Sequence, residues 1–598
     1  MSYTRWTIPA LFLAAAFFAR CKDERTAMAT DPFTLQDDHA QWVMPARDYA
    51  STRFSKLDQI NASNVGRLRA AWTFATGHVR GHEAAPLVIG DTMYVVTPFP
   101  NQLYALDLRH SGAVKWKFAP PVAPSAQGVA CCDVVNRGVA YARGRIFMNT
   151  LDGRTIAVDA TSGKELWSTQ LADINKGESI TMAPLVVKDR VLVGNSGGEF
   201  GVRGWLTAVD TESGKIAWRA YSTGPDSEML IGKSFKPFYA ADRNPNLGVS
   251  TWPKDKWKIG GGTVWGWISY DPQLDLIYYG TGNPGPWNPE QRPGDNKWTS
   301  SIIARRPETG EAIWAYQFSP HDEFDHDGIN EQVLLDLPIG GRTRKVLLRP
   351  ERNGYVYVMD RATGEVLSAK PFAHITTSFG VDLRTGRLIP NKEKAPKVGK
   401  LVTDICPASP GAKDWQPSAW SPRTQLLYLP HQNHCQDSGA VEAHYDEGVP
   451  FLGMDVKMHA GPGGHRGEFS AWDPIAGREV WVIRERFPVW SGALATAGDV
   501  VFYGTMDGFF KAVHARTGQL LWQFKTASGI IGQPITYRGP DGRQYVSILA
   551  GVGGWAGAIV AGQLDPRDPT AALGFVNAMT DLPDYTNTGG TLYTFALP

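Results

Sequence analysis

The sequence predicts an all-β protein folded as an eight-bladed β-propeller, and two observations support this prediction. A short pattern recurs along the chain, in which a run rich in β-branched and aromatic residues ends near an Asp, a turn ends at a Gly, and a Trp follows four residues after that Gly. Such runs are typical of strands. An array of independent β-sandwich domains is the alternative, but it predicts Pro- or Ser-rich linkers between the copies, and the sequence has no such linker.

The repeat can be followed from its Gly and Trp residues. Six copies keep both residues: Gly112/Trp116, Gly163/Trp167, Gly214/Trp218, Gly310/Trp314, Gly477/Trp481 and Gly518/Trp522. A seventh copy, VMDRATGEVLS, keeps Gly364 but has Ser368 where Trp is expected. An eighth strand end is visible at residues 72–74, where WTF resembles the WKF that follows Gly112. The chain therefore contains eight units.

Each unit is predicted to be a small antiparallel sheet. The Thr-Gly or Ser-Gly turn supplies the conformational freedom that a tight hairpin needs. A regularly placed Trp can bury its ring against the neighbouring sheet, and radial repetition of such sheets removes exposed edges. Residues 222–257 and 437–467 depart from the period, and we expect them to be surface excursions or a cap.

Residues 1–29 have the features of a signal peptide. A basic residue precedes an apolar run, residues 7–19, which is shorter than the ~20 residues needed to span a bilayer. An A-x-A motif follows at residues 27–29, so we expect export, with residues 30–598 forming a single domain. Cys21 leaves open a lipoprotein signal, although the Arg directly before it argues against one. No second apolar stretch approaches the length of a membrane span.

The charge balance argues against polyanionic partners. The chain has 60 Lys and Arg against 59 Asp and Glu, a formal net charge of +1, so neither nucleic acid nor an anionic membrane surface is predicted as a ligand. Hydrophobic residues make up 43% of the chain, which also contains 63 Gly, 41 Pro and 21 Trp. This composition is typical of a folded, turn-dense protein.

Four cysteines remain once the leader is removed: Cys131, Cys132, Cys406 and Cys435. An even number suits a compartment where disulfides persist. The first two are adjacent, so their Cα atoms lie about 3.8 Å apart, which is below the usual range for a disulfide. A bond between them would be strained, and a reduced, buried pair is the alternative.

One apparent catalytic motif does not fit its sequence context. GNSGG, residues 194–198, matches the G-x-S-x-G of serine hydrolases. That elbow requires a helix after the Ser, whereas the following EFGVRGWLTAVD continues as a strand. We therefore expect no hydrolase site here.

The segment HDEFDHDG, residues 321–328, is a candidate cation site. Asp325 and Asp327 are two residues apart, so both carboxylates point the same way in an extended chain. Like charges held this close repel unless a cation lies between them, although a solvated acidic loop is the alternative for the segment on its own. Asn283 lies in a Gly/Pro-rich segment and Glu199 in a Gly-dense turn. Oxygen donors of this kind suit a hard cation.

The chain resembles the quinoprotein alcohol dehydrogenases from about Asp38 to its C-terminus, and in particular the lanthanide-dependent methanol dehydrogenases. The runs that carry the resemblance are GHEAAPLVIGDTMYVVTPFPNQLYALD, CCDVVNRG, GNSGGEFGVRG, GGGTVWGW, YYGTGNPGPWNP, HDEFDHDG, RNGYVYVMDR and ILAGVGGWAG. These enzymes are eight-bladed propellers that bind pyrroloquinoline quinone (PQQ). So many runs in the same order make the resemblance specific.

The resemblance implies a metal site. It makes Glu199, Asn283 and Asp325 metal ligands, with Asp325 also the catalytic base. Asp327 is the added ligand that separates the lanthanide branch from the calcium branch, where a small residue stands. Three carboxylates bring three negative charges where the calcium pattern brings two, and a trivalent ion gains most from the third. We therefore expect a lanthanide, with calcium as the alternative.

The resemblance also implies a cofactor site. Cys131 and Cys132 would form a strained disulfide ring on one face of the quinone, and Trp265 would stack on the other. Cys406 and Cys435 match a second disulfide of the family. The other residues implied to hold the quinone are Glu83, Arg137, Thr181, Ser196, Gly197, Gly198, Thr263, Arg352, Asp414 and Trp555.

The chemistry of these residue types agrees with the resemblance. The carboxylates of a buried quinone need Arg and hydroxyl partners. Asp325 would take the hydroxyl proton of the alcohol, and Arg352, which the resemblance places at the reactive carbonyl region, would stabilise the negative charge that develops there. Phe324 and His326 stand where the family usually has Trp and Tyr, which bears on the shape of the substrate pocket.

The expected function is periplasmic oxidation of a primary alcohol, most plausibly methanol. A quinoprotein that prefers ethanol or larger alcohols is the first alternative, and a non-catalytic propeller scaffold is the second. The sequence contains no C-x-x-C-H haem attachment motif, so we expect a separate acceptor, a soluble cytochrome c. The resemblance further suggests a homodimer.

Overall fold

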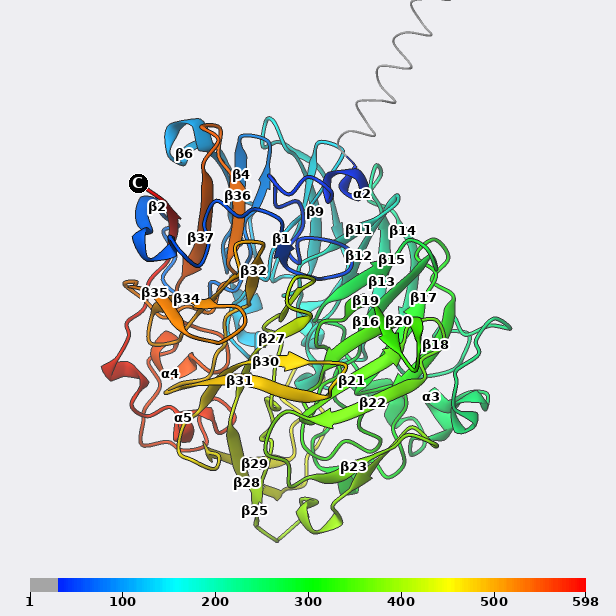
Figure 1. Ribbon diagram of the computed structural model, residues 1–598. Coiled ribbons are helices and arrows are strands. Elements are labelled where there is room, and N and C mark those ends of the chain that lie inside the picture. Colours follow the sequence, from blue (N-terminus) through cyan, green and yellow to red (C-terminus); the bar gives the residue numbers. More distant parts are fainter. Residues whose placement is uncertain (1–30) are drawn as a thin grey trace, which may run out of the picture.

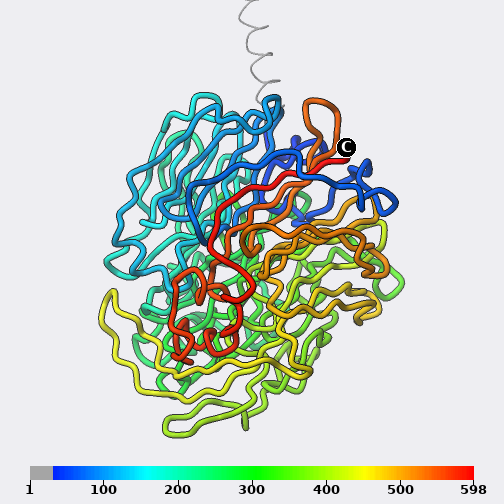
Figure 2. Tube along the Cα trace, turned by 90° about the vertical axis from the view of Figure 1, so that its left-hand side faces the viewer, coloured from blue at the N-terminus to red at the C-terminus, as the bar shows by residue number. Residues whose placement is uncertain are grey.

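The computed structural model describes residues 31–598 of the 598-residue chain. The predicted signal peptide and Cys21 lie outside the described residues. The chain runs once around the molecule, so that the orange and red strands near its end lie beside the blue strands near its beginning (Figure 1). The trace in Figure 2 shows the same closure from the side.

Eight sheets of four hydrogen-bonded strands form the ring, and a short strand is added to one of them. The first four blades along the chain are β3 (Leu87–Ile89), β4 (Thr92–Val96), β5 (Leu103–Asp107), β6 (Ala113–Phe118); β7 (Ala140–Ala142), β8 (Arg145–Asn149), β9 (Arg154–Asp159), β10 (Glu165–Gln170); β11 (Leu185–Val187), β12 (Arg190–Gly194), β13 (Trp205–Asp210), β14 (Ile216–Tyr221); β15 (Ile268–Asp271), β16 (Leu276–Gly280), β17 (Ser301–Arg305), β18 (Ala312–Gln317). Each pairs its strands antiparallel, in chain order.

The next three blades follow the same order. They are β19 (Val333–Ile339), β20 (Arg342–Pro350), β21 (Tyr355–Asp360), β22 (Val366–Pro371); β26 (Ala419–Ser421), β27 (Leu426–Gln432), β30 (Gly467–Asp473), β31 (Arg478–Glu485); β32 (Leu494–Thr496), β33 (Val500–Gly504), β34 (Phe509–His514), β35 (Leu520–Lys525). The short β1 (Phe54–Ser55) adds to β32 in parallel.

The eighth blade closes the ring. It combines the last three strands, β36 (Ile535–Arg538), β37 (Gln544–Ala550) and β38 (Thr591–Ala596), with β2 (Arg69–Ala75) from the beginning of the chain. The predicted strand at residues 72–74 is therefore the outer strand of this blade. Pairing the two ends of the chain in one sheet leaves no open gap in the ring.

Tryptophan rings join neighbouring blades, as the repeat predicts. A Cβ added to Gly163, whose φ is 71°, would lie 2.6 Å from the Trp116 ring, so only Gly allows this approach. The Trp116 indole also donates a hydrogen bond to the Ala160 carbonyl, at 3.2 Å. The same ring-on-glycine contact occurs at Trp72/Gly112, Trp167/Gly214, Trp218/Gly310, Trp314/Gly364 and Trp481/Gly518.

The copy that lacks Trp packs differently. Ser368 lies in β22, and Gly477 of the following blade lies against the aliphatic chain of Lys370 instead of an indole ring. A groove lined in part by Phe372 and Trp472 opens at this junction.

The strand connections divide between two faces of the ring. Since strands alternate in direction, the Gly-containing turns between third and fourth strands lie on one face, which we call the turn face. The connections from second to third strand, and from one blade to the next, lie on the other face, which we call the loop face. The two stretches that depart from the repeat both belong to the loop face.

A cap covers part of the loop face. Its segments are η6 (Ala240–Arg243), α3 (Leu247–Ser250), η7 (Lys256–Ile259), the β23 (Ser378–Asp382) and β24 (Arg387–Pro390) hairpin, the sheet of β25 (Val402–Ile405), β28 (His434–Ala440) and β29 (Met454–Ala460), α4 (Ala558–Ala561) and α5 (Phe575–Ala578). In the described part of the chain, one further α-helix, α2 (Pro32–Leu35), precedes the first strand. No helix within residues 31–598 is long and apolar enough to cross a bilayer.

Candidate metal and cofactor site

The loop face encloses a cavity of about 680 Å³, counted with its open mouth. Residues from loops around the whole ring line it, so it lies on the axis of the propeller. Several predicted site residues lie in its wall: Glu83, Cys131, Cys132, Arg137, Thr181, Ser196, Gly197, Glu199, Trp265, Asp325, Asp327, Arg352, Asp414 and Trp555.

Three of the four predicted metal ligands, Glu199, Asp325 and Asp327, line this cavity, and the fourth, Asn283, is in contact with Asp327. The backbone N–H of Asn283 donates a hydrogen bond to Asp327 Oδ1. Gly198, which precedes Glu199, is so close to Asn283 that an added Cβ would lie 3.3 Å from its Oδ1. Arg352 joins the two aspartates, with Nη1 3.5 Å from Asp325 Oδ2 and Nη2 3.2 Å from Asp327 Oδ2.

The loop that carries the two aspartates is shaped by its own residues. Asp325 adopts a left-handed conformation with φ 66°, which Asp tolerates better than most residues. Asp322 holds the loop, since its carboxylate accepts hydrogen bonds from the backbone N–H groups of Phe324 and His326, at 3.4 and 3.0 Å. The side chains of Asp325 and Asp327 both line the cavity.

The electrostatics of this wall favour a cation. Burial and the charges of Asp327 and Glu199 raise the pKa of Asp325 well above its ordinary value. Burial raises the pKa of Asp327 to about 7 against the opposing charge of Arg352. Burial likewise raises the pKa of Glu199. Asp325 Oδ1 is buried and has no hydrogen-bond partner among the described residues. Two buried carboxylates and the half-buried one of Glu199, with one unpartnered oxygen among them, fit a hard cation.

Cationic and hydroxyl groups line another part of the wall. Arg137 Nε lies 3.0 Å from Glu83 Oε2, and its Nη1 donates to Thr181 Oγ1 at 2.8 Å. The Thr181 hydroxyl is 3.0 Å from that of Ser196. Burial raises the pKa of Glu83 to about 8. These groups can hold the carboxylates of a buried anion.

Aromatic rings give the cavity flat walls. Arg137 lies 4.8 Å from the centroid of the Trp265 ring and 5.1 Å from that of Trp415. Arg352 lies 5.5 Å from Trp265 and donates to Asp414 Oδ1 at 2.8 Å. A flat, anionic aromatic molecule fits between such walls.

Comparison with known proteins identifies the family. The PQQ family described as "Glucose/ethanol/alcohol dehydrogenase, beta-propeller domain" matches residues 42–369 and 466–546. The chain belongs to the quinoprotein alcohol dehydrogenase family. It is 53% identical to the lanthanide-dependent methanol dehydrogenase of Methylacidiphilum fumariolicum, over 94% of this chain and 93% of that protein. It is 45% identical to methanol dehydrogenase [cytochrome c] subunit 1 of Methylobacterium organophilum, over 94% and 92%.

Solved structures agree with this family assignment. A europium-containing methanol dehydrogenase matches with a TM-score of 0.93 and 52% identity, over 94% of this chain and 99% of that chain. A quinohemoprotein alcohol dehydrogenase from Comamonas testosteroni matches with a TM-score of 0.83 and 34% identity, over 96% and 84%. The predicted all-β propeller is confirmed.

Three predicted site residues lie directly behind the cavity wall. Gly198 and Asn283 are in contact with each other, as described above. Thr263 is adjacent, since a Cβ on Gly198 would lie 3.5 Å from its hydroxyl oxygen. The structure therefore brings the whole predicted set together, although its parts come from loops far apart in the sequence.

The cysteines form one bond. Cys406 and Cys435 make the disulfide that the resemblance implies, with an S–S distance of 2.02 Å. Cys131 and Cys132 are free thiols whose Sγ atoms lie 2.7 Å apart. The strained disulfide that the resemblance implies between them is therefore not formed in this structure. The pair is reduced, as in the alternative, but it is not buried, since Cys131 is exposed and Cys132 is half-buried.

Sequence reasoning missed several wall residues, among them Asp133, Trp287, Trp415, Trp490 and Leu573. The sequence offered no selective signal for the three tryptophans, because Trp42, Trp205 and Trp298 also stand outside the repeated Gly-Trp position and are buried in the core. Phe324 and His326, by contrast, do not line the cavity. His326 Nε2 lies 3.3 Å from the Pro407 carbonyl oxygen, behind the loop.

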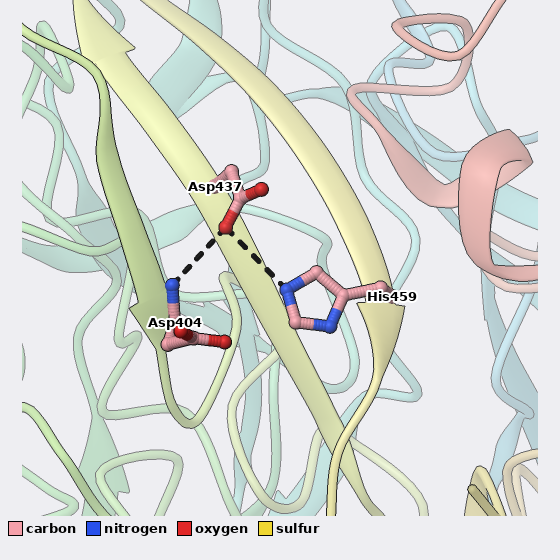
Figure 3. A group of neighbouring side chains, drawn as sticks. All are labelled: Asp404, Asp437 and His459. Carbon is pink, nitrogen blue, oxygen red and sulfur yellow. Dashed lines mark hydrogen bonds and ion pairs between the residues drawn. The ribbon is translucent and has the colours of Figure 1, made fainter.

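A second group of possible metal donors lies in the cap (Figure 3). Asp437 Oδ1 accepts a hydrogen bond from the Asp404 backbone N–H at 3.1 Å and lies 3.5 Å from His459 Nε2. All three side chains are exposed or half-buried, and none of their oxygen or nitrogen atoms is both buried and without a hydrogen-bond partner. We assign no ion to this group.

Proposed function

We propose that this protein oxidises a primary alcohol, with methanol as the preferred substrate, using PQQ and a lanthanide ion. The observation that carries the proposal is the meeting of Glu199, Asp325 and Asp327 in one cavity, where Asp325 Oδ1 is buried without a partner. The family membership and the relatives' names support it. A non-catalytic scaffold would have no reason to bury these carboxylates together.

The residues present fit PQQ. The quinone is flat, and Trp265 and the Cys131–Cys132 pair offer it two opposing walls. Arg137 and Thr181, already joined by a hydrogen bond, would hold its carboxylates.

The residues present also fit a trivalent ion. Glu199, Asp325 and Asp327 would coordinate it with Asn283. At ~4 Å and an effective dielectric constant of about 20, each carboxylate gains on the order of 4 kcal/mol from one more unit of cation charge, before desolvation is subtracted. Calcium is the weaker candidate, because Asp327 adds a third carboxylate.

Asp325 is the proposed general base. When bound, the quinone and its metal supply an electron-pair acceptor polarised by a Lewis acid. A cation among the carboxylates favours their charged forms, and the charged Asp325 can then accept the hydroxyl proton of the alcohol. Arg352 donates a hydrogen bond to the Asp325 carboxylate and orients it. A second hydrogen bond, to Asp414, holds the Arg352 side chain in place.

The proposed electron acceptor is a soluble cytochrome c, since the sequence carries no haem attachment motif. One relative is named a methanol dehydrogenase [cytochrome c] subunit, which agrees with this acceptor. We further propose a periplasmic location, following the predicted signal peptide, and a homodimer.

Reconstitution tests this function. The purified protein is loaded with PQQ and either a lanthanide, calcium or no metal, and dye reduction is measured with methanol, ethanol and formaldehyde. We expect methanol oxidation only with the lanthanide. Full activity with calcium would refute the metal assignment, and a clear preference for ethanol would refute the substrate assignment. Inactivity with every metal would refute the proposal that the protein is an alcohol dehydrogenase.

A further inference from the structure

One segment of the cap presents a basic and apolar surface. Lys392, Lys397 and Lys400 are exposed, and Lys394 is half-buried. None of these lysines forms an ion pair within residues 31–598. The same segment exposes 53% of Val398 and 64% of Leu401. We call these six residues the lysine patch. Free positive charge beside exposed apolar side chains is typical of a surface that meets an acidic protein.

The lysine patch lies on the loop face, directly before β25 at the lower edge of Figure 1. Val402 follows the patch, and its side chain packs in a small buried cluster with Phe324 and Ile405. Phe324 precedes Asp325, whose side chain lines the cavity. A thin layer of side chains therefore separates the patch from the catalytic loop.

One further contact places the patch beside the site. The backbone N–H of Val398 donates a hydrogen bond to Glu290 Oε2 at 3.3 Å. Glu290 lies three residues after Trp287, which lines the cavity.

The proposed reaction requires an exit for electrons. Oxidation of one alcohol to an aldehyde releases two electrons and two protons, and a cytochrome takes one electron at a time, so each turnover needs two encounters. Electron transfer slows steeply with distance, so the acceptor must dock where the wall is thin. Complexes of this kind are small and transient, and charge steers their formation.

We propose that the lysine patch is the docking surface for an acidic, soluble c-type cytochrome. The inference rests on the proposed function, because only the loaded enzyme has electrons to pass. Residues 391–404 contain four Lys against the two acids Glu393 and Asp404, and Glu290 is a third acid beside Val398, so the surface keeps a small positive excess with acids at its margin. Such a margin can orient the partner as well as attract it.

The test uses the holoenzyme and a charge reversal, Lys392→Glu/Lys397→Glu/Lys400→Glu. The probes are a purified acidic c-type cytochrome, a basic mitochondrial cytochrome c and a small dye. We expect kcat/KM for the acidic cytochrome at low ionic strength to fall at least tenfold. Dye reduction should stay within twofold of the wild type, and the basic cytochrome should not lose rate.

A matched control carries the same charge change elsewhere. The control uses three exposed lysines away from the loop face. Lys115 lies in β6, a fourth strand, and Lys164 and Lys215 lie in turns between third and fourth strands. Their triple change to Glu should leave reduction of the acidic cytochrome within twofold. Equal loss in both triple variants, or loss in neither, would overturn the docking proposal.

The remaining outcomes are also decisive. If the wild-type holoenzyme reduces no dye with any alcohol, the proposed function fails and the docking proposal falls with it. If the triple patch variant alone loses dye reduction, the single variants Lys397→Glu and Lys164→Glu are compared instead. The proposal then requires that Lys397→Glu alone lowers kcat/KM for the acidic cytochrome while dye reduction is unchanged, and equal values in the two variants would overturn it. Binding to anionic phosphatidylserine vesicles that the patch variant loses, with cytochrome reduction unchanged, would assign the patch to a membrane and overturn the proposal.

Discussion

The turn face and the loop face of the propeller solve different physical problems. On the turn face, contacts repeat from blade to blade, with an indole ring on a Gly and its N–H on a carbonyl, as for Trp116 and Gly163. On the loop face, buried carboxylates raise one another's pKa, and Asp325 keeps an unpartnered oxygen. The comparison indicates that the stability of the repeating blades allows the loop face to hold buried carboxylates together, an arrangement that lowers stability unless a cation binds.

The largest expected effect comes from the base on the loop face. Asp325→Asn keeps the shape of the side chain but cannot accept the hydroxyl proton, so we expect kcat to fall by about 10³-fold, within the ~10²–10⁴ range of general-base catalysis. Asp455→Asn, at an exposed cap position, is the control and should leave kcat unchanged. Steady-state dye reduction measures both. More than a tenth of wild-type turnover in Asp325→Asn would rule out this role.

The next effect concerns the third carboxylate. Asp327→Ala removes one negative charge from the metal wall, and we expect lanthanide affinity to fall on the order of 100-fold. Terbium luminescence titration of the apoprotein measures it. Lanthanide-dependent turnover at wild-type affinity in this variant would show that Asp327 is not the ligand that selects the metal.

The turn face predicts changes in stability with little change in chemistry. Gly163→Ala forces a left-handed φ on a residue with a Cβ and drives that Cβ into Trp116. Gly90→Ala, with φ 55° and open space around it, has the backbone strain alone. We expect the first to lower the free energy of unfolding by about 1–3 kcal/mol more than the second. Urea unfolding compares the two, and equal losses would mean that the ring contact contributes nothing.

The smallest effect is a pH dependence of the apoprotein. Burial raises the pKa of Asp327 to about 7 from an unfolded value near 3.9, so the folded state binds the proton more tightly. That stability is fully present below about pH 4 and is lost as pH rises through 7. We expect Tm of the apoprotein to fall by about one to two degrees from pH 5 to pH 7 relative to lanthanide-loaded protein. A parallel shift in both forms would contradict the account.

The repeating half of the molecule could be predicted almost completely from the sequence. The Gly-Trp spacing predicted six of the eight sheets, and the runs VMDRATGEVLS and WTF, which resemble the other copies, added the last two. The WTF run located the outer strand that closes the ring. Ser368 shows the limit of this reasoning, since the pattern did not predict that a lysine chain would take the place of the missing indole.

The loop face could be predicted only in part. Spacing placed Asp325 and Asp327 on one side of an extended segment, but it could not show that Glu199 and Asn283 reach them, because loop paths between blades are not periodic. The resemblance to a family supplied those residues. Trp415 and Trp490 were missed for the same reason, as they lie in loops that connect one blade to the next.

Anomalous diffraction from crystals grown with PQQ and a lanthanide tests the central claim most directly. The account predicts one strong lanthanide peak per chain, within coordination distance of Glu199, Asn283, Asp325 and Asp327. A strong peak at Asp404, Asp437 and His459 in the cap, with none in the axial cavity, would contradict it.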